Sequence, residues 1–340
     1  MAGWLWETYT KMTGMIPMLS QGGSSAKENV FSTATLPAGS YSGLGYNGSV
    51  WAAVCSGSTQ AASSSNGTTW TSRSSSSANG WQGIGNVGST FCSVSSAGAQ
   101  TSTDGVTWTA RTMPSSQGYS LRYHYGGVTP PGFVAISNGY GAYSTNGITW
   151  TEFTWPNSRS WQYGGISYNG SMWLYTIDNF SYWYYTSTNG TTWTERKFPI
   201  KSLDQDQEGD YFNGPGWTGT HFVVARGYGR DVIRSTDGIN WTEVSPMQTS
   251  RINPINNPQY VPFSGTGTFA GAHSYAGDAW VTTDGSTWRR FGLRKGGSGH
   301  ARGGADAGLW TQTAYSSTMF AKITGNKLAY MTMKNPGSRS

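Results

Sequence analysis

Short apolar runs, separated by turns rich in Gly, Asn, Asp and Ser, recur along most of this 340-residue chain. Clear examples occupy residues 51–54, 133–136 and 222–225. Runs this short, bounded by turn residues, are typical of β-strands that are covered on both faces. No run approaches the ~18 consecutive apolar residues that a membrane-spanning helix needs. The pattern therefore predicts many short strands and excludes a transmembrane helix.

One seven-residue phrase occurs six times, and its final Trp recurs at spacings of 38 to 48 residues. Each copy has two Ser or Thr residues, Asn or Asp, Gly, a variable residue, Thr or Asn, and finally Trp. The copies occupy residues 64–70, 102–108, 144–150, 187–193, 235–241 and 282–288. Asn-Gly and Asp-Gly supply the positive-φ residues that a tight hairpin turn requires. We expect each Trp to begin the next strand, fill the space between neighbouring units and donate its indole N–H to a carbonyl.

A second phrase begins 16 to 19 residues before four of these turns and also has the composition of a hairpin turn. It occupies residues 46–51, 86–91, 168–173 and 217–222. Apolar runs follow it directly, so each unit reads as strand, turn, buried strand, loop, strand, turn and Trp strand. Four strands at this spacing match the ~40–50-residue period of a propeller blade.

These units resemble the Asp-box (BNR-repeat) β-propellers, a family that includes sialidases and many phage and secreted binding proteins. The family's box reads Ser-x-Asp-x-Gly-x-Thr-Trp, whereas here Gly follows Asp or Asn directly, and Asn replaces Asp in three copies. The resemblance covers about residues 36–290 and implies that the box is a structural turn remote from the binding face. The structural turn residues that it implies are Asn66, Gly67, Trp70, Asp104, Gly105, Trp108, Asn146, Gly147, Trp150, Asn189, Gly190, Trp193, Asp237, Gly238, Trp241, Asp284, Gly285 and Trp288.

The fold expected is a single all-β domain over residues 1–340, a β-propeller of four-stranded blades. Six blades carry the box, and we favour a total of seven blades over six. The segments 310–315, 319–323 and 327–331 read as three strands of the seventh blade, and residues 4–9 as its fourth, so that the two ends of the chain close the ring. Residues 11–35 then form a long loop or docking arm, and residues 332–340 a flexible tail.

Charged residues make up only 11% of the chain, which carries a net charge of +6 and a sequence pI of about 9.2. These charges are spread thinly along the sequence, so nucleic-acid binding is not expected. The N-terminus lacks a basic segment followed by an apolar stretch, so no signal peptide is predicted. Cys55 and Cys92 are too few for a disulfide framework, and we interpret both as small buried side chains.

The sequence gives little support for catalysis. By the resemblance, a sialidase-type enzyme would show an Arg triad, a Tyr–Glu pair, an acid Asp and a Phe/Tyr-Arg-Ile-Pro phrase before the first box, and no such phrase precedes Ser64. The four histidines are scattered over separate units, and no Cys/His spacing is that of a zinc site. We predict no enzyme, no cofactor and no metal centre, and leave open a weakly bound ion at the acidic loop 204–210.

The loops at the end of the blades opposite the boxes are the expected binding face. They carry aromatic rings beside Asn, Asp and Arg, a combination suited to a sugar, whose C–H face stacks on rings while its hydroxyls form hydrogen bonds. The alternative is that many of these rings pack between blades. The candidate ligand-binding residues are Tyr119, Asn138, Tyr140, Trp155, Trp161, Tyr163, Asp178, Asn179, Arg226, Tyr228, Arg230, His273 and Tyr275.

The low charge, the lack of a signal peptide and the variant boxes favour, by analogy, a virion protein made in the host cytoplasm. We expect a bacteriophage tail-fibre, tail-tip or capsid-decorating propeller on the exposed surface of the particle. Its expected role is non-enzymatic receptor binding, through a host-surface glycan or polysaccharide, with other virion structural proteins as partners. Membrane insertion is not expected, and homo-oligomerisation is left open. Two alternatives stand: a purely structural propeller without a ligand, and a sialidase-like glycoside-cleaving enzyme.

Overall fold

The computed structural model is all-β: the residues that it describes form 28 strands and no helix. Because of this, none of the described residues belongs to a helix that could cross a membrane. The described residues are 32–81, 83–114, 120–121, 131–137, 139–157, 165–177, 182–199, 215–225, 232–244, 264–265, 270–273, 279–282, 286, 289–291, 312–315, 319–324 and 327–332.

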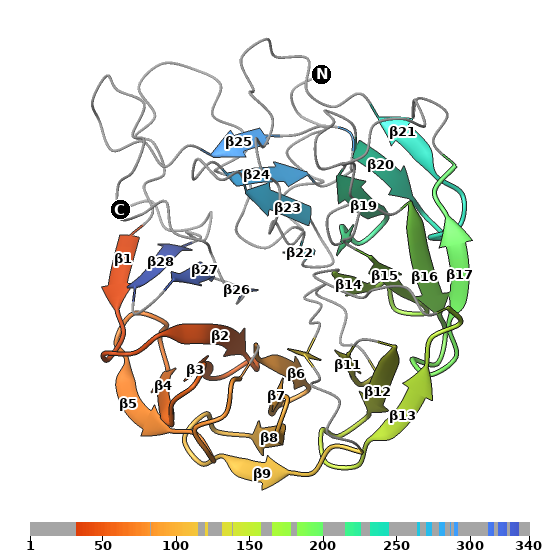
Figure 1. The fold of residues 1–340 in the computed structure, drawn as a ribbon. Coiled ribbons are helices and arrows are strands. Elements are labelled where there is room, and N and C mark those ends of the chain that lie inside the picture. Colours follow the sequence, from red (N-terminus) through yellow and green to blue (C-terminus); the bar gives the residue numbers. More distant parts are fainter. Residues whose placement is uncertain are drawn as a thin grey trace, which may run out of the picture.

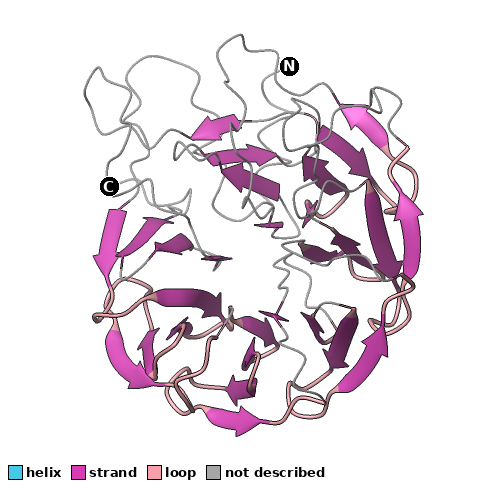
Figure 2. Ribbon diagram, in the orientation of Figure 1, coloured by secondary structure: helices cyan, strands magenta, loops and turns pink. Residues whose placement is uncertain are grey.

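The described strands pair into seven four-stranded antiparallel sheets (Figures 1 and 2). The first three sheets, separated here by semicolons, are β2 (Tyr41–Tyr46), β3 (Trp51–Cys55), β4 (Gln60–Ser64), β5 (Thr71–Ser74); β6 (Gly85–Val87), β7 (Thr90–Ser95), β8 (Gly98–Ser102), β9 (Thr109–Arg111); and β10 (Ser120–Leu121), β11 (Phe133–Ile136), β12 (Tyr140–Ser144), β13 (Thr151–Thr154). The next three are β14 (Ile166–Tyr168), β15 (Trp173–Thr176), β16 (Trp183–Ser187), β17 (Thr194–Lys197); β18 (Gly216–Trp217), β19 (Phe222–Ala225), β20 (Val232–Ser235), β21 (Thr242–Val244); and β22 (Ser264–Gly265), β23 (Ala270–His273), β24 (Ala279–Thr282), β25 (Arg289–Phe291). The last contains β26 (Gln312–Tyr315), β27 (Met319–Thr324), β28 (Lys327–Thr332) and β1 (Ser32–Thr35).

The sheets are arranged around a common centre, with the first strand of each unit innermost and the fourth at the rim (Figure 1). Strand β2 contacts both β26 and β27, so the first and last sheets of the chain are neighbours. Buried hydrophobic clusters lie between adjacent sheets: one joins Val54 of β3 to Phe91 of β7, and another joins Leu174 of β15 to Phe222 of β19. The core is therefore divided into layers between sheets rather than gathered at one centre.

Strand β1 corrects the expectation for the ends of the chain. It pairs with β28 through Ser32↔Tyr330 to Thr35↔Lys327 and is the fourth strand of the last sheet. Residues 4–9, for which the sequence predicts this role, lie outside the described residues. Strand β1 takes up the last four residues of the expected arm 11–35, and the rest of that segment lies outside the described residues. The predicted C-terminal strands are confirmed as β26, β27 and β28.

The apolar runs and turns behave as the sequence predicts. All residues of β3 and β11 are buried, as expected for strands covered on both faces. The second phrase forms hairpin turns, in which the Asn47 amide donates to the Val50 carbonyl and the Asn169 amide to that of Met172. Cys55 and Cys92 are free and buried, as predicted.

Candidate functional site

The recurring box is a hairpin turn held by its own side chains. In the first copy, the Ser64 hydroxyl accepts the Gly67 amide at 2.8 Å, and Oδ1 of Asn66 accepts the amides of Thr68 and Thr69 at 2.9 and 2.8 Å. The other copies among the described residues repeat these bonds with Asp or Asn. Asn and Asp are interchangeable here because each offers the same acceptor oxygen. Of the sixth copy, Asp284, Gly285 and Trp288 lie outside the described residues.

Each box glycine with a described neighbour packs closely on the preceding sheet. Gly147 has φ +72°, and a Cβ placed on it would lie 2.9 Å from Cγ2 of Thr101 and 3.3 Å from Sγ of Cys92 in β8 and β7. Gly105, Gly190 and Gly238 approach the preceding sheet in the same way. Glycine is required at this position both by its positive φ and by the lack of space for a methyl group.

The box tryptophans fill the space between sheets, and most donate an indole N–H as expected. Trp70, Trp150 and Trp193 donate to the carbonyl of their own box glycine at 3.0 to 3.1 Å. Trp241 differs, because its indole donates to the Tyr184 hydroxyl of the preceding sheet at 3.0 Å. Nε1 of Trp108 is buried without a hydrogen-bond partner among the described residues.

The boxes and the first hairpin turns lie at the same end of the sheets. Nδ2 of Asn47, in the β2–β3 turn, donates to the carbonyl of Ser89 in the β6–β7 turn at 2.8 Å and to that of Thr103 in the next box at 2.9 Å. We call this end the box face. Strands alternate in direction, so the loops between second and third strands, and the segments joining one sheet to the next, leave from the opposite end, the loop face.

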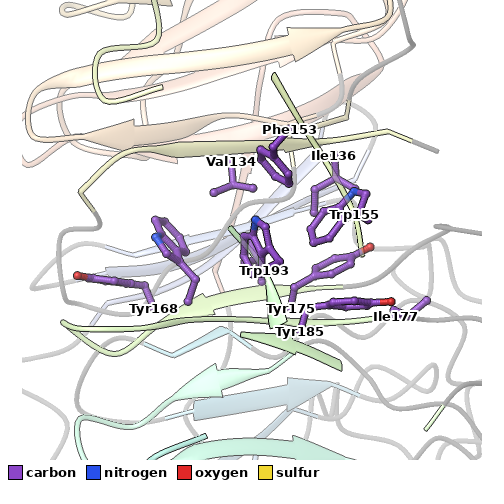
Figure 3. Close-up of a cluster of buried hydrophobic side chains, with 11 residues drawn as sticks. Val134, Ile136, Phe153, Trp155, Tyr168, Tyr175, Ile177, Tyr185 and Trp193 are labelled. Carbon is purple, nitrogen blue, oxygen red and sulfur yellow. The ribbon is translucent and has the colours of Figure 1, made fainter. Parts of the chain in front are cut away.

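Two candidate ligand residues meet at the loop-face end of the third sheet. The Trp155 indole donates to the Tyr140 carbonyl at 3.0 Å, and the Tyr140 side chain is half-buried. Trp155 itself is only 6% exposed and stacks on Tyr175 at a centroid distance of 5.3 Å (Figure 3). The structure thus places Trp155 in the layer between two sheets, where protein atoms cover its ring. The ring therefore packs against protein and does not make the ligand contact expected for it.

The same aromatic layer ends in a polar group at the rim. Oε1 of Glu195 accepts the Tyr185 hydroxyl at 2.9 Å, and Oε2 accepts the Asn157 side-chain amide. Asn157 follows β13 in the segment that leads to β14, so the carboxylate fastens this segment to the outer strand β17. Charge-assisted hydrogen bonds of this kind are stronger than neutral ones. This group could not be predicted from the sequence, because nothing in the spacing of Asn157 and Glu195 marks them as neighbours.

A second fastened segment joins the first sheet to the second. The buried Gln100 of β8 accepts both the Ser76 amide and the Ser76 hydroxyl at 2.9 Å, and Trp81 is 1% exposed with its indole donating to the Ser77 carbonyl. This part of the loop face is thus built from small uncharged residues and one buried ring, and it offers little chemistry to a ligand.

Most other candidates fall outside the described residues. Strand β23 includes His273, whose side chain is not described. The remaining candidates, none of them described, are Tyr119, Asn138, Trp161, Tyr163, Asp178, Asn179, Arg226, Tyr228, Arg230 and Tyr275. The acidic loop 204–210 is not described either. Within the described ranges, no three His, Cys, Asp or Glu side chains are placed to share a metal ion.

The groups whose pKa values are shifted occupy structural positions. Burial raises the pKa of the Cys92 thiol strongly, although the nearby Arg111 acts in the opposite direction. Burial also raises the pKa of Tyr41 to about 12. For Asp104 and Asp237, partial burial acts to raise the pKa, but hydrogen bonds from box amides outweigh it and hold both pKa values below the usual range. None of these groups resembles a general acid or base poised near neutral pH.

The ring of four-stranded sheets defines a propeller-like all-β fold. No protein-family model and no curated protein matches the sequence. Among solved structures, the chain is similar to YCF48 bound to a D1 peptide, with 13% identity, a TM-score of 0.62, and coverage of 91% of this chain and 99% of that chain.

Two lyases show a comparable likeness. One is a streptogramin B lyase, with 11% identity, a TM-score of 0.64, and coverage of 91% of this chain and all of the other. The second is virginiamycin B lyase from Staphylococcus aureus, with 10% identity, a TM-score of 0.66, and coverage of 89% and 99%. At such low identity these similarities concern the fold alone.

Proposed function

We propose that this chain is a seven-bladed Asp-box-type propeller that binds a host-surface glycan through its loop face as part of a virion. In this proposal each of the seven sheets is one blade, and β1 closes the ring against β28. The protein acts in adsorption and performs no chemistry on its ligand. The virion assignment rests on the low charge and the variant boxes of the sequence.

The observation that carries the proposal is the uneven distribution of charge between the loop-face segments. Segments of the three consecutive sheets from β14 to β25 contain 15 charged residues, counted between the strand ends. The equivalent segments of the other four sheets contain one, Arg159. By sequence position, two fifths of the charged residues thus belong to the loop-face segments of these three sheets. Such concentration is typical of a recognition surface on loops held by a rigid scaffold.

The chemistry of these segments suits a carbohydrate. Both signs of charge are present, with Arg226 and Arg230 in the β19–β20 loop and Asp178 in the β15–β16 loop. Aromatic residues such as Tyr228 and Tyr275 stand in the same segments. Charged and amide groups bond hydroxyls or acidic groups of a sugar, and rings stack on its C–H faces.

The test is retention on an array of bacterial and mammalian glycans, with shortened products measured on the same spots. We expect retention without cleavage, and loss of retention in a variant carrying Arg226→Ala, Tyr228→Ala and Arg230→Ala. The matched control is Ser96→Ala, an exposed position in the uncharged β7–β8 loop on the same face. Equal retention by both variants would refute the assignment of the face, and cleavage would show an enzyme.

A purely structural propeller is the first alternative. It predicts no retention on any glycan together with stable incorporation into particles. Absence of both retention and cleavage on the array, combined with co-purification of the chain with assembled virions, would favour this alternative.

A second alternative is an enzyme, because two of the similar solved structures are streptogramin lyases. One related structure of the virginiamycin B lyase contains quinupristin. Incubation of this chain with quinupristin, followed by liquid chromatography, tests this candidate directly. Time-dependent conversion at catalytic amounts of protein would establish turnover and overturn the non-enzymatic proposal.

A further inference from the structure

Three arginines occupy equivalent positions on the outer strands. Arg73, Arg111 and Arg196 each stand three residues after the box Trp, and Nε of each donates to a hydroxyl on the neighbouring third strand at 2.9 Å, namely to Ser63, Thr101 and Thr186. Each side chain is half-buried. We call them the rim arginines.

Three aliphatic side chains form a second repeated feature, at the box face. Val106, Ile148 and Ile239 follow the box glycine in their copies and are 40%, 47% and 43% exposed. In the part of the chain whose side chains are described, they are the exposed large hydrophobic residues. Isolated exposed aliphatics need no explanation, but recurrence at one position of a structural repeat does. We call them the box aliphatics.

The rim arginines and the box aliphatics lie on the two sides of the same junctions between adjacent sheets. Ser63 accepts Nε of Arg73, and its Cβ lies 3.5 Å from a Cβ placed on Gly105, the residue before Val106. Thr101 likewise accepts Nε of Arg111 and lies 2.9 Å from a Cβ placed on Gly147.

The third junction has the same arrangement. The hydroxyl of Thr186, in β16, accepts Nε of Arg196, and Thr186 pairs with Leu174. A Cβ placed on Gly238 would lie 3.2 Å from Leu174. Each of these junctions therefore has one rim arginine on one sheet and one box aliphatic on the next sheet.

At each of the six boxes the two features are either both present or both absent. Where the preceding outer strand has an Arg three residues after its Trp, the residue after the box glycine is Val or Ile. Where it has Phe153 or Val244 instead, that residue is Thr191 or Ser286. Box one follows β1, which contains no Arg, and has Thr68. Ordinary packing does not require this correlation, because the aliphatic groups are exposed.

We propose that the three junctions with a rim arginine and a box aliphatic form a docking surface for a protein partner that presents acidic and aliphatic side chains together. A guanidinium group whose Nε is already hydrogen-bonded can offer its remaining N–H groups to a carboxylate of the partner. The Arg side chain then loses little conformational freedom on binding. Val and Ile offer apolar area without the aromatic face that sugars prefer. A single exposed ion pair contributes little to binding free energy, so the surface depends on the presence of the same pair of groups at three junctions. This surface is separate from the loop face.

The experiment is selection from a ribosome-displayed library of random dodecapeptides against the immobilised full chain. We expect enriched peptides to contain Asp or Glu together with Leu, Ile or Val. Enrichment of peptides without acidic residues, or no enrichment at all, would overturn the proposal.

Two matched variants locate the binding. One replaces Val106, Ile148 and Ile239 by Thr, which the chain itself has at Thr68 and Thr191. The other replaces the three rim arginines by Gln. Each is expected to weaken the enriched peptide about tenfold, a factor that corresponds to 1.4 kcal/mol in total.

The control is Lys197→Gln. It removes an exposed cation whose Nζ lies over the Trp183 ring and which is not one of the rim arginines. It should leave peptide binding unchanged. Unchanged binding in both triple variants, with unaltered melting temperatures, refutes the assignment of the surface. Glycan retention by the triple variants is expected to equal that of the wild type, so failure of this proposal and failure of the loop-face proposal give different results.

Discussion

Replacement of a box glycine by alanine separates two physical reasons for its presence. Gly147 has φ +72°, and a methyl group there would meet Cγ2 of Thr101 at 2.9 Å. Gly88, in the β6–β7 turn, has φ +55°, and no atom lies within 4 Å of the position that a methyl group would take. Alanine in this left-handed region costs about 1–2 kcal/mol at either site. The collision in the first case adds about 1–3 kcal/mol, because Thr101 and Cys92 are buried in strands that cannot retreat.

We therefore expect Gly147→Ala to lower the free energy of unfolding by about 2–5 kcal/mol, and Gly88→Ala by about 1–2 kcal/mol. The entropic gain from replacing glycine is the same in both variants and cancels in the comparison. Urea titration followed by tryptophan fluorescence measures both values. If the two variants lose equal stability, the close approach of the box to the preceding sheet has no energetic role, and the reasoning fails.

Three further predictions concern the layers between sheets and one box turn. Trp193→Ala removes a 5%-exposed ring and should cost about 3–5 kcal/mol in urea titration, whereas a surface-like loss below ~1 kcal/mol would contradict its buried place. The lowered pKa of Asp104 stabilises the fold above its unfolded value of ~3.9, and this contribution is lost as pH falls through the folded pKa. Asp104→Asn, which keeps the acceptor, should thus lose less stability than the wild type between neutral and acidic pH; identical pH profiles would exclude the effect. Finally, Cys55 and Cys92, buried and with raised thiol pKa values, should react with a thiol reagent only after unfolding, and rapid labelling of the native protein would disprove their burial.

The repeated turns could be predicted because their structure is local. Asn66 and Ser64 bond the amides of their own turn, so the seven residues carry the information for the turn by themselves. The buried strands were equally readable, since a short apolar run between turns has few alternatives. What the sequence leaves unspecified is pairing between distant segments.

The closing strand illustrates that limit. Ser32–Thr35 is short and polar, and its place is fixed only by the ladder that it forms with β28. The aromatic segment 4–9 has a stronger strand pattern, and this pattern misled the assignment. Trp155 shows the corresponding problem for sites: a ring in a loop has the same sequence signature whether it faces a ligand or packs between sheets. The rim arginines, by contrast, stand at a constant offset from the box Trp, so this feature is visible in the sequence.

The seam between β1 and β28 has a mechanical consequence. Ser32 pairs with Tyr330, so the start of β1 and the end of β28 lie at the same edge of the ladder. A force that pulls these two ends apart acts on one pair at a time, in unzipping geometry, and never loads the four pairs together in shear. The ring is expected to yield first at its seam, at low tension, while the sheets from β2 to β25 stay folded. Tethered through one end only, the same ring would not feel this load at all.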